Sequence, residues 1–202
     1  MRRTKEEALA TRKAILKAAL KCFSKQGYAL TTITDIAKRI KFSKGAVFWH
    51  FKSKEDLLAE LILQECQTYD PLKKLDDAQT VADLKAAFMD WAEVLLKNRE
   101  LRQFMTFAVS RIEWSETLKK TLAGKLRSVL TGDPWTRLLH CLQRLRAAEL
   151  IETPLSDEQL LVLLRVTFMG THREVWLNHS EIDILSTIEA GLDMILNQIE
   201  RK

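Results

Sequence analysis

The sequence predicts an all-α protein of about nine helices. Apolar residues recur at three- and four-residue spacing along most of the 202-residue chain, which is the pattern of helices that each bury one face. Neither the alternating pattern of a β-strand nor an internal repeat occurs. With only 6 Gly and 3 Pro, the chain also has few residues that favour loops, so its one or two domains are expected to be mostly helical.

Capping residues set the expected helix ends. Gly27 ends the first helix, because glycine adopts the left-handed conformation of a C-terminal cap at least cost. Thr32 with Asp35 three positions later resembles a capping box, and Ser53 with Asp56 repeats the spacing. Together with the apolar periodicity, these signals predict helices at residues 6–25, 33–40, 44–50, 53–70, 80–98, 101–112, 115–130, 134–149, 156–178 and 181–200.

Charge is distributed unevenly along the chain. Residues 1–60 hold 14 Lys and Arg against 6 Asp and Glu, whereas the remainder holds 18 against 21. A basic N-terminal part on a mildly acidic body indicates an anionic partner at one end only. The best break in the helical pattern is the polar stretch at residues 73–78. By function, we expect an N-terminal domain of residues 1–52 and a C-terminal domain of residues 53–202.

Several classes of protein lack support in the sequence. No stretch approaches the ~18 apolar residues of a membrane span, and the N-terminus lacks a signal peptide, so we expect a cytoplasmic protein without a membrane partner. Cys22, Cys66 and Cys141 are expected to be reduced, mostly buried thiols, and a redox role stays open. Neither metal-ligand spacing nor a nucleophile–base pair occurs. We therefore expect neither a cofactor nor enzymatic activity.

Residues 31–58 have the spacing of a helix-turn-helix. Their sequence is Thr-Thr-Ile-Thr-Asp-Ile-Ala-Lys-Arg-Ile-Lys-Phe-Ser-Lys-Gly-Ala-Val-Phe-Trp-His-Phe-Lys-Ser-Lys-Glu-Asp-Leu-Leu. Two short helices are joined by a three-residue turn, and a further helix is capped directly afterwards. This arrangement lets one helix lie across a DNA backbone while the second enters the major groove. We therefore expect double-stranded DNA as a partner.

The expected DNA contacts lie on and around the second of these helices. Lys44 is the best candidate for a guanine edge, and the Ala46 methyl group is suited to meet a thymine methyl. Thr32 and Thr34 can donate hydrogen bonds to phosphate, although capping alone explains them equally well. The full set of expected DNA-binding residues is Thr32, Thr34, Lys41, Ser43, Lys44, Gly45, Ala46, Phe48, Trp49, His50 and Lys54.

The same segment resembles the TetR/AcrR family of bacterial transcriptional repressors. The shared pattern is Thr-Thr, Asp-Ile-Ala, a turn ending in Ser or Thr, Lys/Arg-Gly, an aromatic residue with His-Phe, and Lys-x-x-Leu. The opening Arg-Arg-Thr-Lys-Glu-Glu-Ala looks like the family's multidrug-efflux regulators. Two residues depart from the pattern, because Lys41 replaces the usual Gly and Phe48 the usual Tyr. A left-handed Lys41 would cost on the order of 1 kcal/mol, and Phe48 lacks a hydroxyl group for phosphate.

The last two predicted helices are suited to dimerisation. Pairing their apolar stripes across a two-fold axis would form a four-helix bundle, and the dimer would present two DNA-binding domains to a palindromic operator. The alternative is that both stripes bury only against their own chain. The stripe residues are Leu160, Leu163, Leu164, Val166, Ile184, Ile188, Leu192, Ile195 and Ile199.

The resemblance implies that the central helices enclose a pocket for a small lipophilic inducer, whose binding releases DNA. The candidate lining residues are Phe88, Trp91, Met105, Val109, Met169 and His172, although most large apolar residues in such helices are plain core. The expected function is that of a ligand-responsive repressor of an efflux or detoxification gene. The alternative is a helical adaptor, or an activator without a small-molecule inducer.

Overall fold

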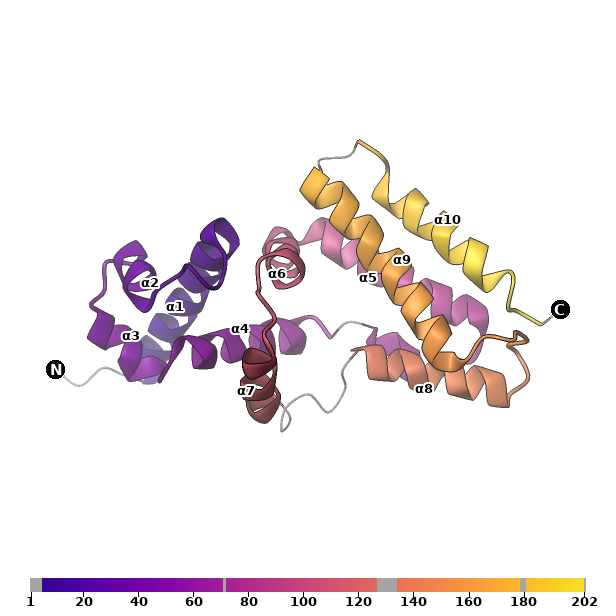
Figure 1. Ribbon diagram of the computed structural model, residues 1–202, viewed down its shortest axis with the longest axis horizontal. Coiled ribbons are helices and arrows are strands. Elements are labelled where there is room, and N and C mark those ends of the chain that lie inside the picture. The colour runs from indigo at the N-terminus through magenta and orange to yellow at the C-terminus, as the bar shows by residue number, and fades with distance from the viewer. Residues whose placement is uncertain (1–4, 71, 127–133, 179–180, 202) are drawn as a thin grey trace. The chain divides into compact units, whose positions relative to one another are not determined.

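The computed structural model describes residues 5–70, 72–126, 134–178 and 181–201 (Figure 1). Over these residues the chain forms ten α-helices and the short 3₁₀ helix η1 (Lys73–Asp76), with β-structure limited to a single bridge, so the all-α prediction is confirmed. The helices are α1 (Lys5–Gln26), α2 (Ile33–Arg39), α3 (Lys44–His50), α4 (Lys54–Thr68), α5 (Val81–Lys97), α6 (Arg99–Ser110), α7 (Glu116–Leu126), α8 (Pro134–Ala147), α9 (Asp157–Asn178) and α10 (Ile184–Leu196).

Most helix ends lie within two residues of the predicted ones, and α10 is the main exception. The prediction extended it to residue 200, whereas the helix ends at Leu196. The chain then pairs with the segment before α9, where the amide of Glu152 donates to the carbonyl of Ile199 at 2.8 Å and Arg201 donates to Leu150 at 3.1 Å. Before this pairing the chain makes a tight turn, in which the amides of Ile199 and Glu200 donate to the carbonyl of Leu196 at 3.1 and 3.0 Å. The predicted residues 127–130 of the seventh helix lie outside the described part of the chain.

The chain divides into two compact units, residues 1–69 with 100–131 and residues 70–99 with 132–202. The first unit contains α1 to α4, α6 and α7. Phe23 of α1 lies at its centre, fully buried and stacked on Phe107 of α6 with 5.4 Å between ring centroids. The first unit therefore includes α4. The predicted functional boundary at residue 52 instead assigns α4 to the C-terminal domain. That functional boundary stays a prediction.

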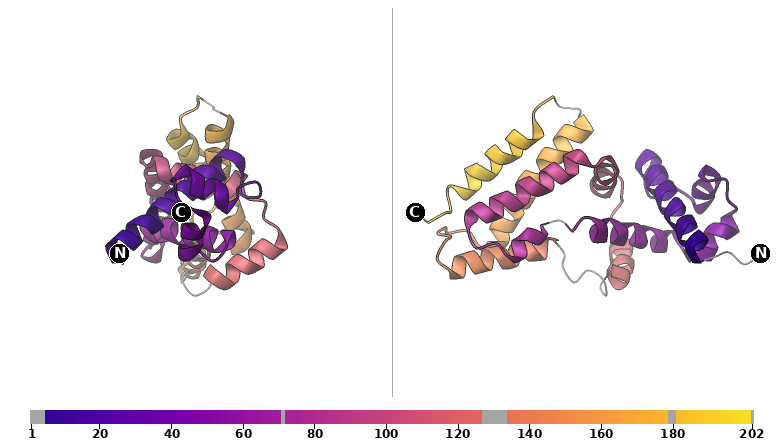
Figure 2. Two further views of the ribbon diagram at one scale, coloured as in Figure 1. Left: turned by 90° about the vertical axis from the view of Figure 1, so that its left-hand side faces the viewer. Right: turned by 180° about the vertical axis from the view of Figure 1, so that it is seen from behind.

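The second unit consists of η1, α5, α8, α9 and α10. Helices α9 and α10 lie side by side in both ribbon views (Figures 1 and 2). They approach closely at Gly191, where an added Cβ would lie 2.6 Å from Cγ2 of Thr167. On α5, Lys85 forms ion pairs with Glu189 at 2.9 Å and Asp193 at 2.7 Å, which tie α5 to α10.

Most of the predicted dimerisation stripe is core of the chain itself. The residues that are at least 95% buried within the chain are Leu160, Leu164, Ile184, Ile188, Leu192 and Ile199. The alternative interpretation therefore holds for these six residues. Exposed apolar side chains remain on α9, namely Val162 at 43%, Leu163 at 42% and Val166 at 60%.

Candidate nucleic-acid interface

A capping box fixes the start of α2. The Thr32 hydroxyl accepts a hydrogen bond from the Asp35 amide at 3.2 Å, and the Asp35 carboxylate accepts one from the Thr32 amide at 2.9 Å. The hydrogen bond from the Thr32 hydroxyl lowers the pKa of Asp35. The capping role of Thr32 is therefore confirmed. Thr32 is exposed and Thr34 half-buried, and their contact with phosphate stays a prediction.

The turn after α2 has the geometry of a Schellman motif. Lys41 takes the left-handed conformation, with φ of 57°. Its amide donates to the carbonyl of Lys38 at 3.1 Å, and the amide of Phe42 donates to Ala37 at 2.9 Å. These are the two hydrogen bonds that define the motif, whose left-handed position usually holds glycine. The fold accordingly places a lysine where it is conformationally unfavourable and leaves that side chain exposed.

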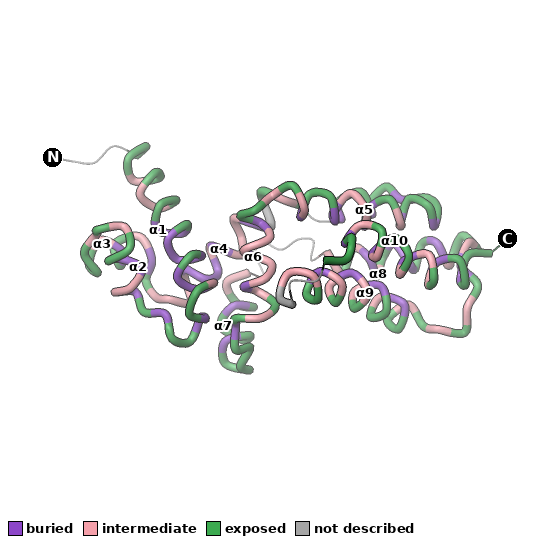
Figure 3. The backbone as a smooth tube through the Cα atoms, turned by 90° about the horizontal axis from the view of Figure 1, so that it is seen from above, coloured by how far each residue is buried: buried purple, intermediate pink, exposed green. Residues whose placement is uncertain are grey.

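Helix α3 is anchored on one side and presented to solvent on the other. The hydroxyl of Ser43 caps it by accepting from the amide of Ala46 at 3.1 Å. Val47 is fully buried, whereas Phe48 is 42% and Trp49 71% exposed. Most of α3 is accordingly coloured as exposed or intermediate in Figure 3. The Lys44 ammonium lies 5.6 Å from the centre of the Phe48 ring. Exposed aromatic rings and cations are suited to contact a nucleic acid, which offers flat bases, sugars and negatively charged phosphates.

Packing against the described residues does not require the glycine at position 45, in the first turn of α3. A Cβ at this position would meet only the Ser43 hydroxyl, at 3.9 Å, which is an ordinary contact. Glycine within a helix costs roughly 0.5–1 kcal/mol relative to alanine. A glycine that the fold does not need is explained if a partner approaches the backbone of α3 closely.

Arg12 of α1 holds the C-terminal end of α3. Its guanidinium group donates to the carbonyl oxygen of His50 at 2.9 Å, lies 4.4 Å from the centre of the Phe51 ring, and pairs with Glu60 at 2.9 Å. The His50 ring meets Trp49 edge to face, with centroids 4.6 Å apart. The orientation of α3 is thus set by α1 and α4, which sequence spacing alone did not reveal.

Lys54 has partners within the chain. Its ammonium group donates to the carbonyl oxygens of Tyr28 at 2.9 Å and Ala29 at 3.1 Å, and lies 4.3 Å from the centre of the Tyr28 ring. A cation in the first turn of a helix opposes the helix dipole, and these carbonyls explain its placement without a phosphate. Its contact with DNA stays a prediction.

Residues after α6 hold the same loop between α1 and α2. The amide of Tyr28 donates to the carbonyl of Arg111 at 3.0 Å, and the amide of Ala29 donates to the carboxylate of Glu113 at 3.2 Å. Sequence reasoning missed Arg111 and Glu113 as supporting residues, because about 84 residues separate them from the loop. The loop that leads into the helix-turn-helix is therefore fixed from α4 and from the end of α6.

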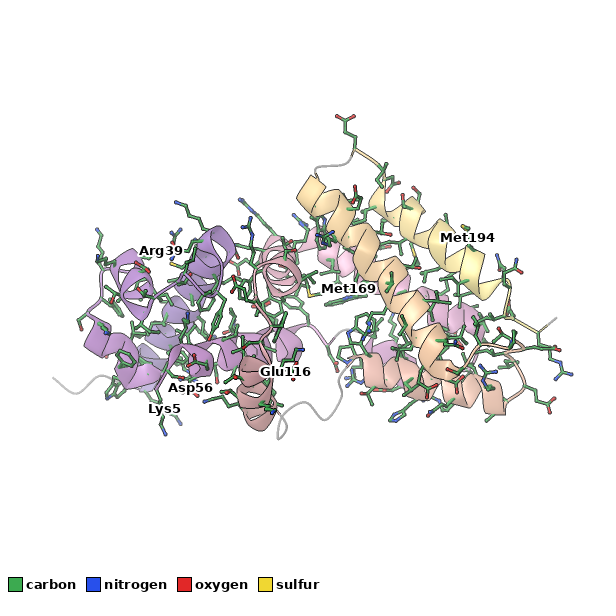
Figure 4. The ribbon with its side chains drawn as sticks, in the orientation of Figure 1. Lys5, Arg39, Asp56, Glu116, Met169 and Met194 are labelled. Carbon is green, nitrogen blue, oxygen red and sulfur yellow. The ribbon has the colours of Figure 1, made fainter. Side chains whose placement is uncertain are left out.

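The expected inducer-binding residues are divided between the two units. Phe88, Trp91, Met169 and His172 belong to α5 and α9 of the second unit, where Phe88 is fully buried and His172 is 3% exposed. Met169 is half-buried (Figure 4). Met105 and Val109 lie on α6 of the first unit. Whether all six line one pocket stays a prediction.

The cysteines offer no reactive thiol among those described. Cys22 and Cys141 are buried, and burial raises the pKa of each thiol. The side chain of Cys66 lies outside the described part. No group of three potential metal ligands occurs in the described ranges. In the same ranges, every helix is too short or too polar to cross a membrane.

The paired helices α2 and α3, joined by a tight turn and with α3 capped and largely exposed, have the arrangement of a helix-turn-helix domain. Residues 15–61 match the model for bacterial regulatory proteins of the TetR family. The transcriptional regulator TtgR of Pseudomonas putida is 40% identical over 83 residues, which are 41% of this chain and 40% of that protein. The chain therefore matches less than half of the length of this relative.

Longer matches have lower identity. The probable acrEF/envCD operon repressor of Escherichia coli K12 is 23% identical over 199 residues, covering 96% of this chain and 89% of that protein. The structure of SmeT, the repressor of the Stenotrophomonas maltophilia multidrug efflux pump SmeDEF, is 25% identical with a TM-score of 0.74, covering 96% and 93%. Residues 15–61 are therefore similar to the N-terminal DNA-binding domain of the TetR-family regulators.

Proposed function

We propose that this protein is a ligand-responsive transcriptional repressor. It binds a palindromic operator as a homodimer through α3, and a small lipophilic inducer releases it. The observation that carries the proposal is the exposed face of α3, where Lys44, Gly45 and Trp49 are unused by the fold's own core. The uneven charge supports it, because the basic residues 1–60 contain this helix.

An exposed apolar surface on α9 supports the homodimer. Val162 and Leu163 line an open hollow of about 440 Å³ together with Leu155, Glu158 and Gln159. Val166 lies one turn further along the helix and is 60% exposed. A two-fold axis beside α9 would let the same residues of two copies cover each other. On α10, Met194 adds a further exposed apolar group (Figure 4).

The comparisons support a lipophilic inducer and a target gene for efflux. SmeT has been solved in complex with triclosan, and that structure has a TM-score of 0.76 to this chain at 25% identity. The Escherichia coli relative is named a probable operon repressor, and SmeT is named the repressor of a multidrug efflux pump. By extension, the present chain acts on DNA in the cytoplasm and controls an efflux or detoxification gene.

The test is a gel shift with the DNA upstream of the protein's own gene, at 50 and 200 mM salt. We expect a specific complex that weakens at high salt, because phosphate contacts release counterions. Addition of triclosan, as a first lipophilic probe, should release the DNA. If the folded protein bound no DNA specifically, neither in this gel shift nor in a selection from random DNA, the repressor proposal would be wrong and the helical adaptor would be favoured.

A further inference from the structure

A row of aromatic rings crosses the second unit. Phe88 of α5 contacts Phe168 of α9 with ring centroids 5.4 Å apart. Along α9, His172 lies 4.4 Å from Phe168 and 4.6 Å from Trp176. His172 is only 3% exposed, whereas Trp176 is half-buried. The imidazole therefore lies between two aromatic side chains, with the tryptophan as the more accessible neighbour.

The hydrogen bond of His172 determines its tautomer. Its Nδ1 atom lies 2.7 Å from the carbonyl oxygen of Phe168. Because a carbonyl oxygen can only accept, Nδ1 carries the hydrogen. Burial lowers the pKa of His172 to about 4, so the ring is neutral at pH 7. In a neutral ring with the hydrogen on Nδ1, Nε2 holds a lone pair and is an acceptor.

Among the described residues, this acceptor has no hydrogen-bond partner. Nε2 of His172 is buried and makes no hydrogen bond with any described residue. A buried polar atom without a partner is unfavourable, and most such atoms in folded proteins are satisfied. Phenylalanine would fill the same aromatic row without this penalty. The position is therefore costly for folding alone, and a donor supplied from outside the chain would remove the cost.

We propose that Nε2 of His172 accepts a hydrogen bond from the hydroxyl group of an aromatic inducer. The inference rests on the proposed function, because it specifies the ligand class of the same regulatory unit. The ring of the ligand joins the row formed by Phe88, Phe168 and Trp176, and its hydroxyl group satisfies the buried acceptor. Access requires a neighbouring side chain to move, and Trp176 is the half-buried member of the row. The site selects neutral, phenol-like compounds over aromatic compounds without a donor.

The test compares 2-naphthol with 2-methoxynaphthalene, in which a methyl group replaces the hydroxyl hydrogen and removes the donor. Binding to the full chain is measured directly by calorimetry at pH 7, without DNA. We expect the naphthol to bind on the order of tenfold more tightly, because the ether leaves Nε2 unsatisfied. Equal affinities, or no binding of either probe, would overturn the proposal, and this comparison needs no variant.

His172→Phe identifies the acceptor. The variant should lose the preference for the naphthol and bind both probes alike, whereas His140→Phe, at an exposed position on α8, should keep it. A preference that survives in folded His172→Phe would place the acceptor elsewhere and contradict the inference. The gel shift separates the two proposals. If triclosan releases the operator but the two naphthalene probes bind equally well, only the role of His172 is rejected. If the protein prefers the naphthol but binds no operator, only the repressor function is rejected.

Discussion

At the scale of single residues, Lys41 has an unfavourable backbone conformation with an exposed side chain. Its φ of 57° favours glycine. We expect Lys41→Gly to raise the free energy of unfolding by up to about 1 kcal/mol in urea titrations, while weakening DNA binding if the ammonium group contacts phosphate. The control is Lys38→Gly within α2, which should lower stability by about as much. Destabilisation by both substitutions would show that the left-handed turn is not strained.

Gly45 separates the requirements of the fold from those of DNA binding. Because a Cβ meets no close neighbour there, Gly45→Ala should raise the free energy of unfolding by roughly 0.5–1 kcal/mol. Operator affinity should fall, since the methyl group prevents close approach of α3 to DNA. Gly124→Ala on α7, also in open space, should stabilise the protein without changing affinity. Unchanged affinity of Gly45→Ala would remove the argument for close approach.

His172 should make the protein sensitive to acid. Burial lowers its pKa from 6.5 to about 4, so the unfolded chain binds the proton first as the pH falls. The contribution of His172 to the free energy of unfolding is therefore fully present above about pH 6.5 and is lost between about pH 6.5 and 4. The loss of unfolding free energy between pH 7 and 4.5 should be on the order of 2 kcal/mol smaller in His172→Phe than in the wild type. Equal losses in the two proteins would contradict a buried, neutral imidazole.

At the scale of elements, the contact of α9 with α10 depends on one glycine. An alanine Cβ at Gly191 would lie 2.6 Å from Cγ2 of Thr167, so Gly191→Ala should lower the melting temperature by forcing the helices apart. Thr167→Ser removes that methyl group and should restore most of the loss in the double variant. Gly170→Ala on α9, with open space around it, serves as the control. A neutral Gly191→Ala would mean that the helices can separate at little cost.

The elements also show how far sequence could predict this structure. The bounds of α3 are those predicted, 44 to 50, because its cap and its turn are local signals. The end of α10 was missed, because the chain after the helix pairs with a distant segment: Glu200 forms a bridge with Ile151, 49 residues earlier. Likewise, the exposed residues of α3 follow from spacing, whereas the partners of Lys54 come from the loop 25 residues earlier. Long-range contacts leave no periodic trace in the sequence.

At the scale of the whole molecule, recognition of a palindromic operator requires a dimer. Val166→Glu places a charge in the proposed interface on α9 and should yield monomers in light-scattering measurements, with operator affinity reduced at least tenfold. Val94→Glu provides a matched control, because Val94 is an exposed valine of α5 at 38%. Monomers in both variants, or dimers in both, would exclude Val166 as a specific interface residue.

Recognition of a two-fold operator by α3 can be measured by selecting bound sequences from random DNA. The selection is made with the wild type, Lys44→Ala and Lys120→Ala, an exposed lysine of α7. The wild type and Lys120→Ala should select one inverted repeat of two half-sites, while Lys44→Ala should lose preference at the same position of each half-site. A wild-type pool that converges on no inverted repeat, or an identical repeat selected by Lys44→Ala, would contradict the account.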